Sequence, residues 1–462
     1  MATTVEEDLE EATRPKRSWQ KSNIVTSVLL ASLVIFLFHI LVSPFYSSLN
    51  SSLAKEALNS KFHGELKASN ITFLPLKDIR FAKTAMDGNT WFMSSLNDTY
   101  DPNHAEHLLF PSEKYEGKLL CINASTGVDG TKNSYALAWP EALPDSAILL
   151  KGLSFVSYTY YDFYNLWHGV SALAPFVGWS MRKGCLKPKR WILFAKGSLQ
   201  TATGPWLRQL MVANFGQVPI RRFWKRNALQ VPYCFEQALV MRHDVGKMSR
   251  EQRWDVFQEI RCKARSFCGI QPGKKMKDLS GSGAPLIRFT LLMRRGSRAF
   301  KDPQAVSEIF RKECEKFDGC VMKVAQSEDL GFCQQVKVLT YTDILASPHG
   351  AQMTNMIFMD RNSTVMEFFP KGWRELAGAG QYAFHWLAQQ CGMNHPDAWW
   401  EKLDKKDCPH PENDHECWNF YKNGQLGHNE TFFAEWARTV LNQVRLRKQQ
   451  LDNVHNISSC SC

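Results

Sequence analysis

One stretch near residue 350 constrains the fold more than any other part of the chain. Two apolar segments, at residues 343–346 and 364–369, flank the sequence Ser-Pro-His-Gly-Ala-Gln-Met-Thr-Asn-Met at 347–356. Short apolar segments joined by a glycine turn and a helical pattern predict a strand, a short buried helix and a second strand. These elements belong to a βαβ unit, so the sequence predicts an α/β fold with a parallel sheet.

The turn within this stretch is also a candidate anion site. Ligands of open parallel sheets bind at the carboxyl edge, where a strand passes into a helix. Gly350 lets a group approach the backbone, and the free N–H groups of the helix start attract anions. We expect Thr354 or Asn355 to cap that helix. The alternative is an ordinary strand–helix turn of any α/β protein.

The pattern His-Gly-Ala-x-x-Thr-Asn-Met, followed by a segment ending in Glu-Phe-Phe-Pro, resembles the donor-site signature of glycosyltransferase family 61, and its details resemble plant members. The resemblance extends from Tyr158 to Arg438. Members usually carry glycine where this chain has Gln352, a difference expected to alter the fit around the donor. The resemblance implies two Rossmann-like domains of the GT-B type. It also implies inverting transfer of a sugar, here xylose or arabinose, from a UDP-sugar to a hydroxyl of a wall polysaccharide, an N-glycan or a glycoprotein.

Two other functions fit the same resemblance. One is transfer of N-acetylglucosamine to protein or glycan, as in animal relatives. The other is a non-catalytic lumenal protein that binds UDP-sugars or glycans.

An apolar segment near the N-terminus predicts a membrane anchor. Residues 24–42 carry no formal charge, and nineteen residues span a bilayer at about 1.5 Å per residue. Basic residues precede this segment and no charge follows until Lys55, which places the N-terminus in the cytosol. A cleaved signal peptide is the alternative. We predict a cytosolic tail (1–22), a transmembrane signal anchor (23–43) and a lumenal stem (44–80), as in a single-pass type II Golgi membrane protein.

Cysteines and charge agree with a lumenal enzyme. All thirteen cysteines lie between Cys121 and Cys462, and seven Asn-x-Ser/Thr sequons follow the apolar segment. This asymmetry favours a secretory lumen on the C-terminal side, and the odd count leaves a cysteine outside any internal pair. The net charge of +11 favours anionic partners such as nucleotide diphosphates, a membrane surface or an acidic polysaccharide. The membrane segment argues against nucleic acid.

The lumenal part is expected to contain an acceptor-side α/β domain (81–280), a donor-binding α/β domain (281–390) and a C-terminal extension with a helix that packs back (391–462). A glycine- and lysine-rich linker is expected at 271–284. Strands are expected at 147–150, 154–160, 191–195, 231–235 and 285–293, and helices at 205–215, 250–267, 304–317, 328–335 and 429–445.

Two groups of residues are candidates for the chemistry of transfer. Asn165 and His168 share a face if their segment is helical, and a neutral imidazole accepts a proton from a sugar hydroxyl. The family has an Asn-x-x-His motif here, so His168 is the candidate base, supported by Asn165. Its role as base or phosphate partner stays open, and an interior structural histidine is the alternative.

The second group is the candidate donor site. Arg294 and Arg298 follow a predicted strand, and family members carry two arginines with this spacing. Guanidinium groups suit a diphosphate because they stay charged and offer paired donors; a solvated basic loop is the alternative. Glu367 is expected to bind ribose or to be buried with a structural partner. His349 is expected to donate to a phosphate or to shape the turn. Together with Gly350, Thr354 and Asn355, these residues are the predicted donor site.

No metal or other cofactor is expected. The sequence lacks the Asp-x-Asp motif that holds a metal ion in many lumenal transferases, so arginines and a helix start must meet the diphosphate charge. Cys408, His410, His415 and Cys417 are zinc-type ligands on paper. A local Cys408–Cys417 disulfide is favoured in an oxidising lumen, and the pairs Cys262/Cys268 and Cys314/Cys320 have similarly short spacing.

Overall fold

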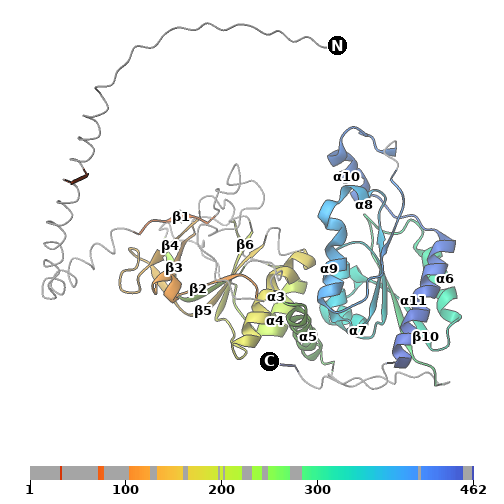
Figure 1. Cartoon of the computed structure of the whole chain (residues 1–462), viewed down its shortest axis with the longest axis horizontal. Coiled ribbons are helices and arrows are strands. Elements are labelled where there is room, and N and C mark those ends of the chain that lie inside the picture. Colours follow the sequence, from red (N-terminus) through yellow and green to blue (C-terminus); the bar gives the residue numbers. More distant parts are fainter. Residues whose placement is uncertain are drawn as a thin grey trace, which may run out of the picture. The chain divides into compact units, whose positions relative to one another are not determined.

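Two β-sheets organise the described part of the chain (Figure 1). The computed structural model describes residues 32–33, 71–76, 104–124, 133–159, 165–195, 198–200, 203–220, 231–241, 248–270, 283–403, 407–450 and 460–462. The chain divides into two units, Met1–Asn70 and Ile71–Cys462, and the second unit holds both sheets. No helix among the described residues is long and apolar enough to cross a bilayer. The predicted anchor at 23–43 lies outside the described residues, apart from Ser32 and Leu33.

The second sheet has five strands, all parallel, in the order β10-β9-β11-β12-β13. Its strands are β9 (Ile287–Met293), β10 (Cys320–Gln326), β11 (Ile344–Pro348), β12 (Thr364–Phe369) and β13 (Ala398–Trp400). The predicted strand–helix–strand unit is confirmed, because β11 and β12 pair in parallel around the short helix η4 (Ala351–Phe358). The strand order reverses between β9 and β11. In open α/β sheets such a reversal creates a crevice at the carboxyl ends of the strands, where ligands bind.

Helices cover both faces of this sheet (Figure 1). The strands alternate accordingly: Leu291 of β9 packs with α6 (Pro303–Glu315) and α11 (Glu430–Gln450), and Leu292 packs with η4, α7 (Phe332–Thr340) and α9 (Ala383–Gln390). Successive side chains of a strand point to opposite faces, which is why each strand contributes to both cores. The sheet is therefore buried on both sides, as parallel sheets usually are.

The first sheet mixes parallel and antiparallel pairs. Its strands are β1 (Leu74–Pro75), β2 (His107–Phe110), β3 (Leu119–Asn123), β4 (Ser134–Ala138), β5 (Ile148–Thr159), β6 (Arg190–Ala195), β7 (Ser198–Gln200) and β8 (Tyr233–Met241). Strand β5 is parallel to both β6 and β8, and the other pairs are antiparallel. The α/β class is thus confirmed, but this half is not a purely parallel sheet.

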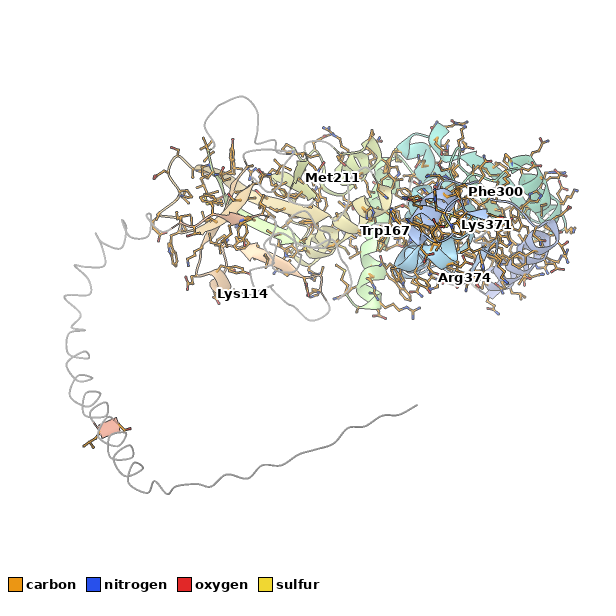
Figure 2. The ribbon with its side chains drawn as sticks, turned by 90° about the horizontal axis from the view of Figure 1, so that it is seen from above. Lys114, Trp167, Met211, Phe300, Lys371 and Arg374 are labelled. Carbon is orange, nitrogen blue, oxygen red and sulfur yellow. A yellow bond between two sulfur atoms is a disulfide. The ribbon has the colours of Figure 1, made fainter. Side chains whose placement is uncertain are left out.

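The two sheets share one apolar core. Helices α3 (Leu166–Arg182), α4 (Pro205–Phe215) and α5 (Arg250–Phe267) pack on the first sheet, and their buried side chains join those of η4, α7 and α9 in one cluster. Trp167 on α3 and Met211 on α4, both labelled in Figure 2, pack in this cluster together with Met353 and Ile357 of η4. Burial of this shared apolar surface is the main force that holds η4 against α3 and α5.

Helix ends with clear sequence signals were predicted to the residue. Helix α4 starts with a proline at its first position, and α5 starts at the Ser249–Gln252 capping box. The predicted helix at 328–335 is displaced, because a short turn, η3 (Ser327–Asp329), precedes α7. The shorter elements that remain are η1 (Glu113–Tyr115), α8 (Trp373–Leu376), η5 (Gly378–Tyr382) and α10 (Asp414–Lys422).

Six disulfides connect the described residues. The predicted local pairs Cys314–Cys320 and Cys408–Cys417 are confirmed. The predicted pair Cys262/Cys268 is wrong, because these cysteines flank the last turn of α5 and each bonds a distant partner. The remaining disulfides are Cys121–Cys234, Cys185–Cys462, Cys262–Cys460 and Cys268–Cys333. Cys391 is buried and unpaired, as the odd count requires.

Candidate functional site

The reversal of strand order between β9 and β11 gathers most of the predicted donor site. Arg294 follows directly on β9, and His349 and Gly350 follow on β11. These two strands are hydrogen-bonded neighbours, so their carboxyl ends lie side by side. Arg294 Nη1 lies 3.4 Å from the His349 carbonyl oxygen, to which it donates. Two segments that lie 55 residues apart therefore meet at one edge of the sheet.

Gly350 is needed for close packing rather than for an unusual backbone angle. Its φ of 162° is extended backbone that any residue adopts. A Cβ at this position, however, would overlap Arg294 Nη1. The group that approaches the glycine turn is thus the guanidinium of Arg294. Gln352, the residue that departs from the family pattern, supports it, since its Oε1 accepts from Arg294 Nη1 at 3.3 Å and its Nε2 donates to the Pro348 carbonyl at 2.6 Å.

Arg298 lies beside Arg294 in a strained backbone conformation. Its φ is 61°, in the left-handed region that side chains other than glycine rarely adopt. The conformation is held by a hydrogen bond from its N–H to the Gly424 carbonyl at 2.7 Å. Its guanidinium lies 5.2 Å from the centre of the Trp373 ring. Burial and the neighbouring Arg294 charge lower the pKa of Arg298 to about 10.

The two arginines offer donors that the protein does not use. The buried Nε atoms of Arg294 and Arg298 have no hydrogen-bond partner among the described residues. Burial also lowers the pKa of Arg294. Arg295 differs, because it is exposed and pairs with Asp329 through two hydrogen bonds. Two half-buried cations with unused donors form a site that favours a multivalent anion.

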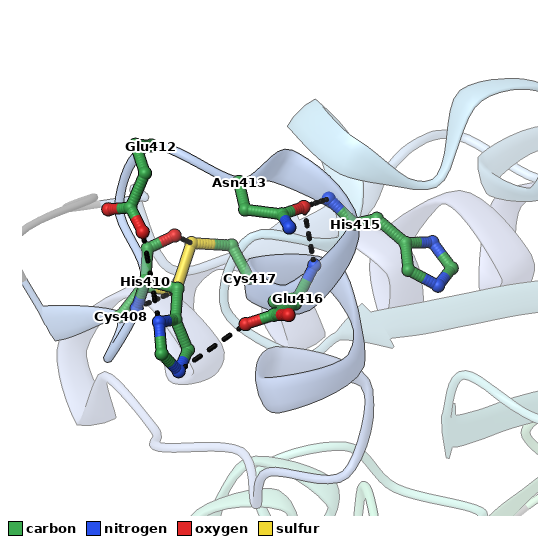
Figure 3. Close-up of a disulfide and its surroundings, with 7 residues drawn as sticks. All are labelled: Cys408, His410, Glu412, Asn413, His415, Glu416 and Cys417. Carbon is green, nitrogen blue, oxygen red and sulfur yellow. Dashed lines mark hydrogen bonds and ion pairs between the residues drawn. A yellow bond between two sulfur atoms is a disulfide. The ribbon is translucent and has the colours of Figure 1, made fainter.

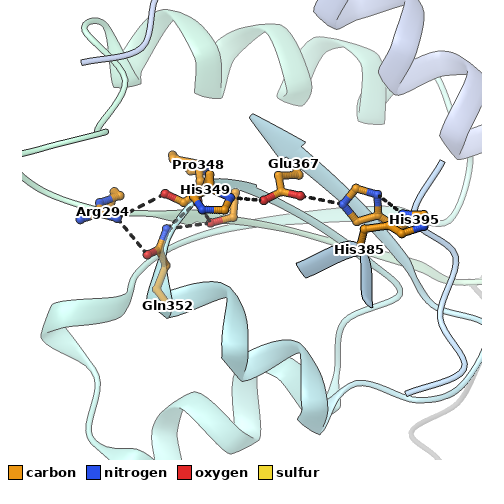
Figure 4. A network of polar contacts seen from close by, with 8 residues as sticks. Arg294, Pro348, His349, Gln352, Glu367, His385 and His395 are labelled. Carbon is orange, nitrogen blue, oxygen red and sulfur yellow. Dashed lines mark hydrogen bonds and ion pairs between the residues drawn. The ribbon is translucent and has the colours of Figure 1, made fainter. Parts of the chain in front are cut away.

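Behind the arginines, one carboxylate holds two histidines (Figure 4). Glu367 of β12 is fully buried, and its Oε1 accepts from His349 Nδ1 at 2.5 Å. Its Oε2 accepts from His395 Nε2 at 2.9 Å. His395 Nδ1 lies 3.5 Å from His385 Nδ1, and Gln389 Nε2 donates to His385 Nε2 at 2.9 Å.

The charges in this network follow from its surroundings. The pKa of His349 lies below its ordinary value, chiefly because the ring is buried and secondarily because Arg294 and Arg298 are close, although Glu367 opposes the shift. The pKa of Glu367 is lowered; burial alone would raise it, and the two histidines outweigh that effect. Glu367 is therefore ionised and His349 neutral near pH 7.

Thr354 and Asn355 belong to the interior of η4. The prediction that either caps the helix is wrong, because η4 begins one residue after Gly350, which is its N-cap, and no side chain caps it. Both side chains are buried. Asn355 Oδ1 accepts from Trp206 Nε1 of α4 at 3.0 Å, and its Nδ2 donates to the Gln352 carbonyl at 2.9 Å. Asn355 thus ties η4 to the first half of the molecule.

Asn165 and His168 lie at the start of α3, after the carboxyl end of β5. Asn165 is the N-cap, and its side chain accepts from the Trp167 N–H at 3.1 Å. His168 is on the first turn, with its ring edge-on to Trp167. Helix α3 packs against η4. These two residues are not part of the network around Glu367 (Figure 4), which therefore joins only residues of the second sheet and its helices.

The zinc alternative at residues 408–417 is not supported (Figure 3). Cys408 and Cys417 form a disulfide, so neither offers a thiolate to a metal ion. His410 contacts Glu412 and Glu416 instead. Among the described residues no group of three or more histidine, cysteine, aspartate or glutamate side chains is arranged to hold a metal ion.

Sequence reasoning missed three residues of the site: Gln352 as the support of Arg294, Trp373 as the ring between Arg298 and His349, and His395 as the second partner of Glu367. The segment after Pro370 is rich in tryptophan and histidine, and that composition was the available signal. The Trp373 ring lies 4.1 Å from the His349 ring, measured between centroids.

Comparison with solved structures gives only weak likenesses. A rubredoxin oxygen:oxidoreductase from Desulfovibrio gigas is 9% identical over 47% of this chain and 44% of its own, with a TM-score of 0.22. The flavodiiron protein from Giardia intestinalis is 10% identical over 53% of this chain and 52% of its own, with a TM-score of 0.24. This chain thus spans about half the length of those proteins, and likenesses at such scores carry no argument.

Comparison with protein families is informative. No curated protein matches the chain. The model of the family described as Glycosyltransferase 61 matches residues 153–366, a range that contains α3, both candidate arginines and the signature at the start of η4. The family implies glycosyltransferase activity with a sugar donor and a glycan acceptor. The match over residues 153–366 supports glycosyltransferase family 61 as the family of this part of the chain.

Proposed function

We propose that the protein transfers a sugar from a UDP-sugar whose diphosphate binds between Arg294, Arg298 and the start of η4. One observation carries this proposal: the half-buried guanidinium of Arg294 meets the glycine turn where the strand order of the parallel sheet reverses, and the half-buried Arg298 lies close to Arg294, each with an unused donor. That is the position at which open α/β sheets bind their ligands, and a fixed set of donors there stabilises charge that develops on a leaving diphosphate.

The reaction we propose is an inverting single displacement. A base removes the proton of the acceptor hydroxyl while that oxygen attacks the sugar, and the diphosphate leaves towards the two arginines. His168 is the proposed base, because it lies at the start of α3, the helix that packs against η4. Asn165 fixes the first turn of that helix as its cap. Near neutral pH an imidazole is a suitable acceptor for such a proton.

Xylose or arabinose is the proposed sugar, and the acceptor is a hydroxyl of a polysaccharide, N-glycan or glycoprotein. We place the first sheet on the acceptor side and the second on the donor side, as in a GT-B arrangement. Thr354 and Asn355 support the donor turn from within η4. For Glu367 we favour action through His349 over contact with ribose, since both of its oxygens are already bonded.

The disulfides support a lumenal location. Twelve of the thirteen cysteines are paired, and two of these pairs secure residues 460 and 462. Disulfides in such number are typical of proteins that fold in an oxidising compartment. Together with the apolar segment at 24–42, they support a type II Golgi membrane enzyme. Protease protection of an epitope at each end of the chain in sealed microsomes tests this topology.

The activity is tested with a panel of UDP-sugars and the purified full-length chain, scored by released UDP and by label transferred to glycan acceptors, with and without EDTA. Arg298→Ala should weaken UDP binding by at least about tenfold, because hydrogen bonds to a charged group are lost. Arg295→Ala is the matched control: it removes an exposed neighbouring arginine that pairs with Asp329 and should leave UDP binding unchanged.

The outcomes separate the competing functions. Release of UDP from UDP-N-acetylglucosamine alone would replace the pentosyltransferase with an N-acetylglucosaminyltransferase. Binding of UDP with no turnover of any UDP-sugar would favour a binding protein. If Arg298→Ala binds UDP as tightly as the parent, the proposed diphosphate site is wrong.

A further inference from the structure

The contacts around Glu367 fit a consistent arrangement of hydrogens. Glu367 is ionised and accepts on both oxygens, so His349 carries its hydrogen on Nδ1 and His395 carries its hydrogen on Nε2. In this arrangement His395 accepts on Nδ1. His385 supplies that hydrogen from its own Nδ1 and accepts on Nε2 from Gln389. This arrangement satisfies every described contact of the carboxylate and the three rings.

This arrangement excludes a proton wire through the carboxylate. Hydrogen bonds converge on Glu367 from both sides, so neither neighbour can accept a proton from it without first giving up its own. The network instead holds one negative charge in place and fixes the tautomer of His349. As a result, Nε2 of His349 carries no hydrogen and is an acceptor in the empty protein.

An unprotonated ring nitrogen that faces a diphosphate is unfavourable, because both groups present lone pairs to each other. The charged groups that face His349 are Arg294 and Arg298 after β9 and Glu367 on β12, and the rings of His395 and His385 lie behind Glu367. The esterified diphosphate of a UDP-sugar brings two negative charges. The two arginines and the carboxylate supply one positive charge in total, so one charge stays unbalanced in a half-buried site.

We propose that His395 is a positioning residue that acts on His349 through Glu367, and that a UDP-sugar binds together with one proton at Nε2 of His349. This inference rests on the proposed function, because it requires the diphosphate to bind at the two arginines. The bound proton makes His349 an imidazolium held between Glu367 and the diphosphate. It balances the remaining charge and converts the acceptor into a donor. In the empty site, burial and the two arginine charges lower the pKa of the His349 ring. The negative charge of a bound diphosphate opposes both effects and raises that pKa.

The test is titration calorimetry of the full-length chain with UDP-xylose, without acceptor, at about pH 7.5 in buffers of different ionisation enthalpy. UDP-xylose is chosen over UDP because its esterified phosphates do not titrate near neutral pH, whereas a terminal phosphate does. The slope of the binding enthalpy against buffer enthalpy gives the protons taken up. We expect an uptake approaching about one proton, decreasing at lower pH where the ring is already charged.

Three variants separate positioning from structural support. His349→Gln should bind with no uptake. His395→Ala removes one donor from Glu367 and should shift the pH at which uptake is half-maximal, whereas His395→Gln, which keeps a donor, should restore the parent profile. His415→Gln, an exposed histidine of α10, is the matched control and should behave as the parent. Thermal melts confirm that each variant is folded.

The outcomes distinguish this inference from the function on which it rests. Absence of binding by both UDP and UDP-xylose overturns the proposed function and this inference together. Binding with an uptake indistinguishable from zero, or an uptake that persists in His349→Gln, overturns only the inference at His349. A His395→Ala profile identical to the parent overturns the positioning role of His395.

Discussion

Two energetically unfavourable features occur together at Arg298. Its backbone is in the left-handed region without being glycine, and its guanidinium is half-buried beside a second arginine. Such strain costs about 1–3 kcal/mol and persists at sites where function requires it. Both features are explained if the residue is retained to hold an anion.

A glycine at position 298 should therefore separate stability from binding. Arg298→Gly removes the strain and the buried charge, so the free energy of unfolding in urea should stay equal to that of the parent or rise by up to about 1 kcal/mol. UDP affinity should fall at least about tenfold, as in Arg298→Ala. Arg298→Ala is the comparison, because it keeps the backbone strain and should be less stable than the glycine variant. A glycine variant that is less stable than the alanine variant would contradict this account.

The neutral state of His349 predicts acid sensitivity. The pKa of this buried ring is below its ordinary 6.5, so the unfolded chain binds a proton at a higher pH than the folded protein does. Stability is then lost as pH falls below about 6.5. The lowered pKa of Glu367 acts in the same direction but only below its ordinary 4.5. The pKa of His385 is also lowered from its ordinary 6.5, so this residue adds to the loss of stability over the same pH range as His349.

The melting temperature of the parent should thus decrease between about pH 7 and pH 5. His349→Gln should decrease less, because the glutamine amide still donates to Glu367 and does not titrate. The measurement is a series of thermal melts across this range for both proteins. Equal decreases would show that other groups carry the effect.

Among the site residues, the sequence predicted those that belong to a recognisable motif. It missed those whose position depends on which strands pair. Arg294, Arg298, His349 and Gly350 follow strands in a known motif. His395 reaches Glu367 only because β13 pairs with β12 in a register that brings a loop 28 residues away beside the carboxylate. The register between two strands cannot be predicted from a local sequence pattern.

At the scale of elements, η4 is held by the helices of the first sheet. Its last carbonyls accept from two arginines of α5: Arg261 Nε donates to the Ile357 carbonyl at 3.2 Å, and Arg265 Nη2 donates to the Phe358 carbonyl at 2.7 Å. In the middle of η4, Asn355 bonds Trp206 of α4. The middle and the end of η4 are therefore positioned by the other half of the molecule.

Trp206→Phe should loosen this contact. The change leaves Asn355 Oδ1 buried without its donor, which costs about 1–3 kcal/mol of unfolding free energy in urea. UDP affinity should decrease slightly, since Asn355 also bonds the Gln352 carbonyl on the first turn of η4. Trp386→Phe is the matched control because Trp386 is 43% exposed, and it should be close to neutral. Equal stability of the two variants would show that the Trp206–Asn355 bond contributes nothing.

Element boundaries were predictable where local chemistry decides them. The helical spacing of the sequence gave α4 and α5 correctly, and the structure shows that a proline starts α4 and a capping box starts α5. The strand predicted at 231–235 was expected to end before Glu236, whereas β8 continues through Glu236 to Met241. The structure explains it: the pairing of β5 with β8 is irregular between Leu150 and Leu153, and the Gly152 N–H donates to the Glu236 carboxylate at 2.6 Å. The role of Glu236 can be seen only when the pairing of β8 with β5 is known.

At the scale of the whole molecule, the two sheets are joined covalently as well as by their common core. The disulfide Cys268–Cys333 connects the end of α5 to the first turn of α7, across 65 residues of chain. Cys408–Cys417 closes a local loop across 9 residues. The sequence suggested the local pair by its spacing, whereas the long-range pair requires the packing of the two halves to be known.

Removal of the long-range disulfide should cost more than removal of the local one. A cross-link that closes a longer loop restricts the unfolded chain more, so Cys268→Ser with Cys333→Ser should lower the unfolding free energy by about 4 kcal/mol, against about 2.5 kcal/mol for Cys408→Ser with Cys417→Ser. Urea unfolding of both double variants and of the parent measures the difference. UDP affinity should also decrease more in the first variant, because α5 positions the end of η4. If the two double variants are equally stable, the connection between the halves is maintained by the shared core and not by the disulfide.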